Sequence, residues 1–211
     1  TKLEKLINSK SPVLNSLDKS YKFSYDKKRI LRFKKNKNFR VIGMGGSILG
    51  TQAIHDFLRH KIKKKFTFID NLKTAQKKDT KTFTNIVVSK SGNTIETIVN
   101  ANLLIKKSDQ NIFITENKSN NLNILAKKLK SEIIHHNNYI GGRYSVLSEV
   151  GMLPAELMGL NPKKFKNYNS LIKDKRFSRS LLSNVASTLY FIRNKKFNSV
   201  ILNYDEKSEN L

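Results

Sequence analysis

The stretch Ser89-Lys-Ser-Gly-Asn-Thr-Ile-Glu-Thr97 decides the fold that this sequence predicts. It follows the apolar run Asn85-Ile-Val-Val88, which is typical of a buried parallel strand. It leads into apolar residues that recur at helical spacing, namely Ile95, Ile98, Val99 and Leu103. A hydroxyl-rich loop therefore joins the end of a strand to the start of a helix.

The residue types in this loop favour a phosphate ligand. A helix N-terminus offers unpaired backbone N–H groups and a partial positive charge. Ser89, Ser91 and Thr94 add hydroxyl donors, and Gly92 lets the backbone approach a ligand closely. A phosphate group, with its three strong acceptor oxygens, uses all of these features at once. The alternative is a helix cap, because Ser91 with Thr94 and Asn93 with Glu96 have capping-box spacing.

A second motif, Gly43-Met-Gly-Gly-Ser-Ile-Leu-Gly50, follows the strand-like residues 39–42. Glycines and a serine at a strand-to-helix turn suit an anion or a sugar hydroxyl. The spacing departs from the dinucleotide pattern because Ile48 occupies the third glycine position, although Asp70 is a candidate ribose ligand. The motif favours a sugar phosphate over a nucleotide. A tight turn with close helix–strand packing is the structural alternative.

The third motif is GGRYSVLSEVGMLPAEL, residues 141–157. Two glycines present Arg143 at a turn, and an amphipathic helix follows through Val146, Leu147, Val150, Leu153 and Leu157. Arginine makes bidentate bonds of fixed geometry to oxyanions, which lysine does not. The alternative is a structural arginine that ties the loop to backbone carbonyls.

Strands and helices alternate along the middle of the chain. Strands are predicted at residues 40–42, 66–69, 85–88, 112–115 and 133–134, and helices near residues 47–60, 93–107 and 120–130. This order predicts an α/β fold, a doubly wound parallel sheet with helices on both faces. In such sheets ligands bind outside the carboxyl ends of the strands, so the first two motifs should converge there.

The predicted domain organisation has three parts. Residues 1–38 form a polar, lysine-rich peripheral segment with a helix signal at Leu3, Leu6 and Ile7. Residues 39–162 form the first domain, and Asn161-Pro162 is expected to end its last helix. Residues 163–211 form a connector and the incomplete start of a second α/β domain. That start consists of an amphipathic helix at residues 181–192 and a strand at residues 199–202.

Together the three motifs resemble glucose-6-phosphate isomerase (phosphoglucose isomerase), in their order and their intervals. The resemblance spans residues 39–211, and residues 204–211 resemble the family just before its glutamate motif. The first two motifs are shared in part with other sugar isomerase (SIS) domains, which are flavodoxin-like. One departure is Gly92-Asn93, where the family usually has Phe-Thr. The pattern Ser-x-Ser-Gly-x-Thr is closer to SIS domains of other sugar-phosphate proteins.

The resemblance implies an enzyme that interconverts glucose 6-phosphate and fructose 6-phosphate through an enediol, in glycolysis and gluconeogenesis. It assigns the phosphate clamp to Ser89, Lys90, Ser91 and Thr94. It assigns sugar contacts to Gly46 and Ser47, and stabilisation of the enediolate to Arg143. The family's catalytic base is a glutamate beyond Leu211, so the chain is interpreted as a fragment that is inactive alone. No cofactor or metal is implied, and the full-length protein is expected to be a homodimer.

Nearby carboxylates do not supply an alternative base. Glu96 is interpreted as a capping or hydrogen-bonding residue, and Glu149 and Glu156 as helix-surface or structural residues. The adjacent pair His135-His136 would point to opposite faces of a strand, so the two rings are not expected to share a metal ion.

Composition constrains the class of protein. The 211 residues carry a formal net charge of +25 and no cysteine, which excludes disulfides and thiol chemistry within this sequence. The lysines are scattered and no nucleic-acid motif accompanies them, so specific nucleic-acid binding is not expected. No apolar run has transmembrane length, and a soluble cytoplasmic protein is expected. A non-catalytic SIS-type sugar-phosphate sensor remains the alternative function, supported by Gly92-Asn93.

Overall fold

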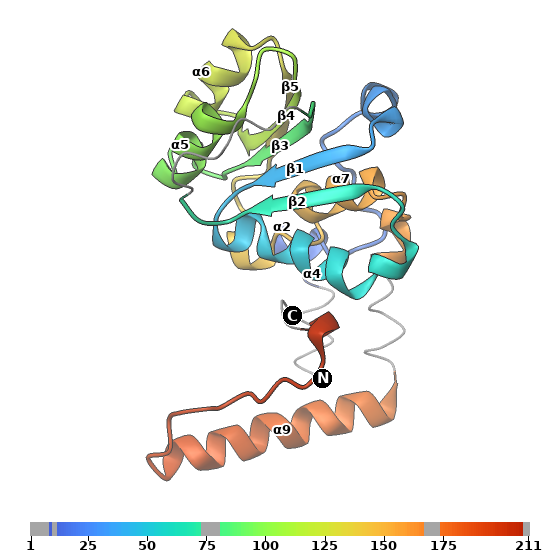
Figure 1. The fold of residues 1–211 in the computed structure, drawn as a ribbon. Helices are drawn as coiled ribbons and strands as arrows, with labels where there is room; N and C mark the ends of the chain where they lie inside the picture. The colour runs from blue at the N-terminus through green and yellow to red at the C-terminus, as the bar shows by residue number, and fades with distance from the viewer. Residues whose placement is uncertain (1–8, 10–11, 73–80, 167–173, 209–211) are drawn as a thin grey trace.

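The computed structural model describes residues 9, 12–72, 81–166 and 174–208. Its centre is a five-stranded sheet in which all neighbouring strands are parallel, in the order β2-β1-β3-β4-β5 (Figure 1). The strands are β1 (Asn38–Ile42), β2 (Lys65–Ile69), β3 (Thr84–Val88), β4 (Gln110–Glu116) and β5 (Glu132–His136). The five strands predicted between residues 40 and 134 are confirmed.

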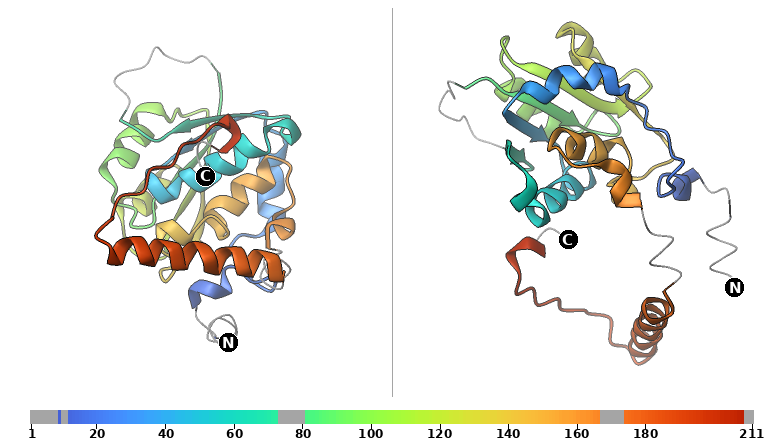
Figure 2. Two further views of the ribbon diagram at one scale, coloured as in Figure 1. Left: turned by 90° about the horizontal axis from the view of Figure 1, so that it is seen from below. Right: turned by 90° about the vertical axis from the view of Figure 1, so that its right-hand side faces the viewer.

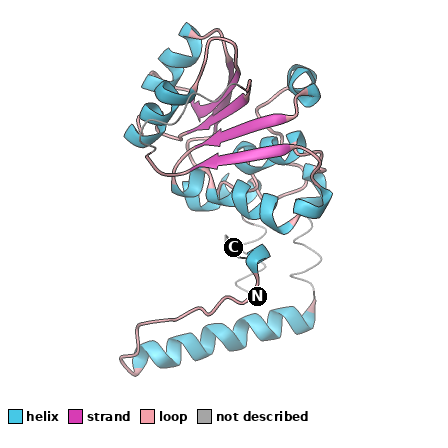
Figure 3. Ribbon diagram, viewed as in Figure 1, coloured by secondary structure: helices cyan, strands magenta, loops and turns pink. Residues whose placement is uncertain are grey.

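Helices cover both faces of this sheet (Figure 3). One face carries α4 (Leu49–Phe57) and α7 (Glu149–Leu157), and the other carries α5 (Ile95–Leu104) and α6 (Asn121–Lys128). The doubly wound α/β prediction is therefore confirmed.

Alternating residues of each strand fill two separate cores. Val41 and Ile86 pack on the α4 and α7 side, whereas their neighbours Ile42 and Val87 pack on the α5 and α6 side. Because successive side chains of a strand point to opposite faces, a strand buried on both faces must be apolar throughout. This explains why the run at residues 86–88 lacks the alternation of a half-exposed strand.

The segment before β1 contributes to the first core, which its polar composition does not indicate. It contains α2 (Pro12–Asn15), α3 (Lys27–Leu31) and the 3-10 helix η1 (Arg32–Lys35). Asp26 caps α3 by accepting a hydrogen bond from the backbone N–H of Lys28. The buried apolar side chains of this segment are Tyr25, Ile30 and Phe33. The predicted helix at Leu3, Leu6 and Ile7 lies outside the described residues.

The helix after the third motif ends earlier than predicted. α7 stops at Leu157, and Gly159 follows in the left-handed region with φ +92°. Glycine adopts this conformation without the steric penalty of a side chain, so it terminates the helix before Asn161-Pro162 is reached. Pro162 instead begins a 3-10 helix, η5 (Pro162–Lys166).

After η5, one prediction is confirmed and one is wrong. The amphipathic helix is present as α9 (Lys175–Arg193), none of whose residues is buried, and Figure 2 shows it apart from the sheet. The predicted strand at Ser199–Leu202 is not formed, and Val200 and Ile201 are 83% and 89% exposed. A strand needs a neighbour for its backbone hydrogen bonds, and no described segment pairs with these residues. Among the described residues, no helix is both long and apolar enough to cross a bilayer.

Candidate functional site

The first two motifs meet where the strand order reverses. β1 and β3 are neighbours, with Ile42 in register with Val87. The chain winds from β1 outward to β2 on one side and from β3 outward to β4 on the other. Loops that leave the carboxyl ends of two such strands diverge and open a crevice, which is where ligands bind in sheets of this type. The predicted convergence of the two loops is confirmed.

The three hydroxyls of the loop after β3 lie together. Ser89 Oγ is 2.8 Å from Thr94 Oγ1 and 3.5 Å from Ser91 Oγ. Ser89 is buried, Thr94 half-buried and Ser91 exposed, so the group extends from the sheet edge to solvent. The side-chain oxygen of Ser89 also accepts a hydrogen bond from the backbone N–H of Gly92.

The helix-cap alternative does not account for these side chains. Thr94 occupies the N-cap position of α5, but its side chain makes no capping hydrogen bond and is paired with Ser89 instead. The backbone N–H of Ile98 donates to Thr94 O, so the N–H groups of residues 95–97 precede the first intrahelical bond. The hydroxyl cluster and the open end of α5 are thus next to each other.

Packing against α6 (Asn121–Lys128) explains why Gly92-Asn93 stands where the family usually has Phe-Thr. Gly92 has φ +68°, and a Cβ placed on it would lie 2.1 Å from Asn120 Oδ1. The Asn93 side chain accepts a hydrogen bond from the backbone N–H of Asn121, and Gly92 O accepts one from Leu122 N. These two residues therefore dock the hydroxyl loop onto the start of α6, and α6 in turn is capped by Asn120.

Lys90 lies at the edge of this loop, and its ammonium already has polar partners within the chain. Its ammonium donates to Asn138 O and lies 3.6 Å from Glu116 Oε1. Glu116 also pairs with Lys118, and this hydrogen-bonded ammonium, assisted by Lys90, holds the pKa of Glu116 below its ordinary value. Lys90 thus links the loop after β3 to the end of β4 and to residue 138.

The glycine motif is held against the third motif by contact between their backbones. A Cβ on Gly46 would lie 2.4 Å from Gly142 C, and one on Gly43 would lie 3.1 Å from Val88 O. The Ser145 hydroxyl donates to Gly46 O across the same junction. The 3-10 helices η2 (Gly45–Ser47) and η4 (Gly142–Tyr144) consequently lie side by side, and the glycine motif contacts both the end of β3 and the third motif.

Gly46→Ala is expected to destabilise the chain by about 1–3 kcal/mol, since backbone atoms would have to move to admit the methyl group. Gly141→Ala is the matched control, because its Cβ would meet only Tyr144 Cδ2, at an ordinary 3.6 Å. Urea unfolding of both variants measures the difference. Equal midpoints for Gly46→Ala and the wild type would contradict the close backbone contact.

Arg143 sits in η4 with an exposed side chain. Within the described part of the chain its guanidinium makes no hydrogen bond or ion pair, so Arg143 does not tie the loop to backbone carbonyls as the alternative interpretation required. The Ser145 hydroxyl, two residues along, shares its hydrogen between Gly142 O within the loop and Gly46 O across the junction. Arg143 is therefore presented by the loop and free to meet a ligand.

The carboxylates and histidines near the motifs have structural surroundings. Glu149 and Glu156 are buried, and they accept hydrogen bonds from Tyr21 and Tyr25 respectively. Their burial was missed because the sequence pattern does not show that tyrosines from the N-terminal segment reach them. His135 is exposed and His136 buried, which confirms that the two rings lie on opposite faces of β5.

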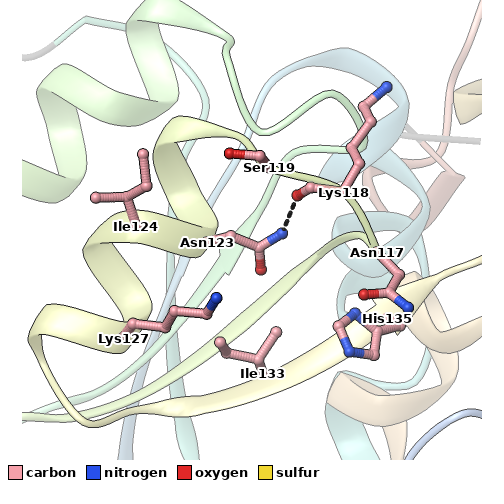
Figure 4. A pocket seen from close by; sticks show the side chains of 8 residues that line it. All are labelled: Asn117, Lys118, Ser119, Asn123, Ile124, Lys127, Ile133 and His135. Carbon is pink, nitrogen blue, oxygen red and sulfur yellow. Dashed lines mark hydrogen bonds between the residues drawn. The ribbon is translucent and has the colours of Figure 1, made fainter.

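A separate cavity of about 440 Å³ lies between α6 and β5. Figure 4 shows its lining, which consists of Asn117, Lys118, Ser119, Asn123, Ile124, Lys127, Ile133 and His135. The Asn123 amide donates to Lys118 O at its rim, and the Lys118 ammonium is paired with Glu116. None of the residues predicted to bind a ligand lines this cavity.

Comparison with known proteins identifies the protein family to which this chain belongs. Residues 26–200 match the family model for phosphoglucose isomerase. The chain therefore belongs to the phosphoglucose isomerase family.

Curated relatives support the same family assignment. The glucose-6-phosphate isomerase of Methanocaldococcus jannaschii is 32% identical over 97% of this chain and 53% of its own length. That of Campylobacter jejuni is 33% identical over 71% of this chain and 39% of its own length. The chain thus spans about half the length of the curated relatives it matches.

A solved structure shows the same fold. A hypothetical protein from Thermus thermophilus superposes with a TM-score of 0.61 at 21% identity, covering 92% of this chain and 51% of that protein.

Proposed function

We propose that the complete protein isomerises glucose 6-phosphate and fructose 6-phosphate, and that this chain supplies its phosphate clamp and one catalytic cation. The observation that carries the proposal is the meeting of the three motifs at the junction of β1 and β3. A hydroxyl cluster at an open helix end, a glycine turn and an unpaired arginine lie on the loops of this junction. That set of groups suits a sugar ring with a phosphate at one end.

The phosphate is bound by the hydroxyls of Ser89, Ser91 and Thr94, with the first N–H groups of α5. These hydroxyls pair with each other in the structure, and when a phosphate binds they donate their hydrogens to its oxygens instead. Lys90 adds positive charge. Holding the phosphate fixes the position of C1 and C2, which are the atoms that react.

The sugar lies along Gly46 and Ser47, on the turn that the backbone contact with Gly142 holds beside the arginine turn. The reaction moves a proton between C2 and C1, and the intermediate carries negative charge on an enediolate oxygen. Arg143 donates to that oxygen and stabilises it more strongly as the charge develops. Stabilising the enediolate requires a cation without a competing anion or carbonyl, and the Arg143 guanidinium has no such partner among the described residues.

The catalytic base is proposed to lie in the part of the relatives that this chain does not span. Glu149 and Glu156 are buried and hydrogen-bonded by tyrosines, so neither can reach a substrate carbon. Assembly as a cytoplasmic homodimer is also proposed for the complete protein, on the resemblance alone. The test of the whole proposal is a coupled isomerase assay on the complete protein, in which the absence of turnover of fructose 6-phosphate would refute it.

The purified 211-residue chain is expected to show no turnover above background, because it holds a clamp and a cation but no base. The control is glucose 6-phosphate binding by calorimetry on the same preparation, which should be retained. Turnover by this chain alone would contradict the assignment. It would return Glu96, on the first turn of α5, to consideration as the base.

A further inference from the structure

Two buried polar atoms face each other without a hydrogen-bond partner. They are His136 Nδ1 and Glu149 Oε2, which are 3.9 Å apart on side chains that are 1% and 0% exposed. A buried polar atom left unpaired costs about 1–3 kcal/mol. Two such atoms aimed at one another therefore require an explanation.

The remaining contacts of the two side chains determine where the protons are. His136 Nε2 lies 3.1 Å from Ile140 O, and a carbonyl oxygen can only accept, so Nε2 carries a hydrogen. If the ring were neutral, Nδ1 would then turn a lone pair toward the lone pairs of Glu149 Oε2. A second proton on the ring replaces this repulsion by the attraction between an imidazolium and a carboxylate, whose 3.9 Å separation is within ion-pair distance.

Glu149 is surrounded by groups that stabilise its anion. Oε1 accepts hydrogen bonds from the Tyr21 hydroxyl at 2.8 Å and from Ser24 N at 3.0 Å. Burial acts to raise the pKa of Glu149, but His136 and these hydrogen bonds outweigh it, so the pKa lies below its ordinary value. The Lys166 ammonium, over the Tyr21 ring at 4.2 Å, adds positive charge on the same side.

The pair closes the loop that carries Arg143. β5 ends at His136 and α7 begins at Glu149, so residues 137–148, here called the arginine loop, are closed at their base by these two side chains. Tyr21 strengthens the closure, because its hydroxyl accepts from Asn137 Nδ2 at 2.7 Å while donating to Glu149. Arg143 has no polar contact of its own in the described structure, so its position follows from the backbone of this loop, which is held at the Gly46–Gly142 contact and at this base.

We propose that His136 and Glu149 form a buried imidazolium–carboxylate pair that fixes the arginine loop and thereby positions Arg143. The effect on catalysis rests on the proposed isomerase function, whereas the pair itself does not. His136 and Glu149 are positioning residues, since neither is exposed to a substrate. The other ionisable groups packed around them are Tyr21, Tyr25 and Lys166.

An NMR measurement of the imidazole nitrogens tests the pair in the 211-residue chain. An ordinary exposed histidine is largely neutral at about pH 7.5. At that pH we expect both nitrogens of His136 to be protonated. In Glu149→Gln we expect a neutral His136 ring with its hydrogen on Nε2. His135→Gln assigns the signals and is the control, because His135 is exposed and lies on the opposite face of the strand. A neutral His136 in the wild-type chain overturns the proposal.

Kinetics of the complete protein test the positioning role. Glu149→Gln is expected to lower kcat about tenfold with KM little changed, because a displaced cation loses its effect on the transition state. In an Arg143→Lys background the same substitution should change kcat less than about twofold, since its effect passes through Arg143. Glu156→Gln is the matched control, being a buried glutamate of the same helix that also accepts from a tyrosine.

Each outcome has a separate meaning. Equal losses from Glu149→Gln in both backgrounds would reject positioning through Arg143. A complete protein without isomerase activity would reject the proposed function and leave the NMR result to decide the pair. If Glu149→Gln does not fold, the wild-type His136 signals still decide whether the imidazolium is present.

Discussion

Arg143→Lys in the complete protein is expected to lower kcat and kcat/KM together by on the order of 10²-fold, with KM little changed. Lysine keeps the positive charge but loses the planar pair of donors that arginine offers to an oxygen anion. An interaction that strengthens as the enediolate forms affects the transition state and not substrate binding, so the loss falls on kcat. Steady-state kinetics with fructose 6-phosphate measures it.

The control for this substitution is Arg59→Lys, in the 3-10 helix η3 (Arg59–Lys61), which has an exposed side chain remote from the three motifs. It should leave both constants unchanged. Melting temperatures of the two variants should match that of the wild type, because Arg143 makes no polar contact within the described residues. A folded Arg143→Lys enzyme with normal kcat would reject the catalytic role.

The double substitution Ser91→Ala and Thr94→Ala is expected to weaken glucose 6-phosphate binding on the order of 10²-fold or more. Each hydrogen bond to a charged group contributes about 1.5–3 kcal/mol, and the variant removes two. Calorimetry on the 211-residue chain measures the affinity directly. Stability should fall only slightly, because Ser91 is exposed and Thr94 loses only its bond to Ser89.

Ser119→Ala is the matched control for the clamp, since Ser119 is an exposed serine of a neighbouring loop that lines the separate cavity. It should bind glucose 6-phosphate as the wild type does. If the double variant also keeps its affinity, the phosphate lies elsewhere and the hydroxyl cluster is only a feature of the loop.

The fold was predictable because its information is local. Short apolar strands, each followed by a helical pattern, define a parallel sheet without knowledge of any distant contact. The convergence of the loops after residues 42 and 88 follows from that topology, and so the place of the candidate site could be predicted as well.

The parts that could not be predicted depend on contacts between residues far apart in the sequence. Glu149 reads as a surface or structural residue of a helix, and only the approach of Tyr21, 128 positions earlier, reveals its burial. The role of Gly92 depends likewise on Asn120. The predicted strand at residues 199–202 failed for the opposite reason, since its local pattern is strand-like but it has no described neighbour to pair with.

The junction of Gly46 with Gly142 has a thermodynamic consequence. Main-chain atoms meet main-chain atoms there, so the contact between the sugar-facing turn and the arginine turn itself contains no side-chain torsion. A side chain that must be ordered on binding loses about 0.5–1.5 kcal/mol of rotamer entropy, and this contact has none to lose. The two turns are thus held in place before a ligand arrives, and the entropy of their relative motion is removed during folding instead of during each binding event.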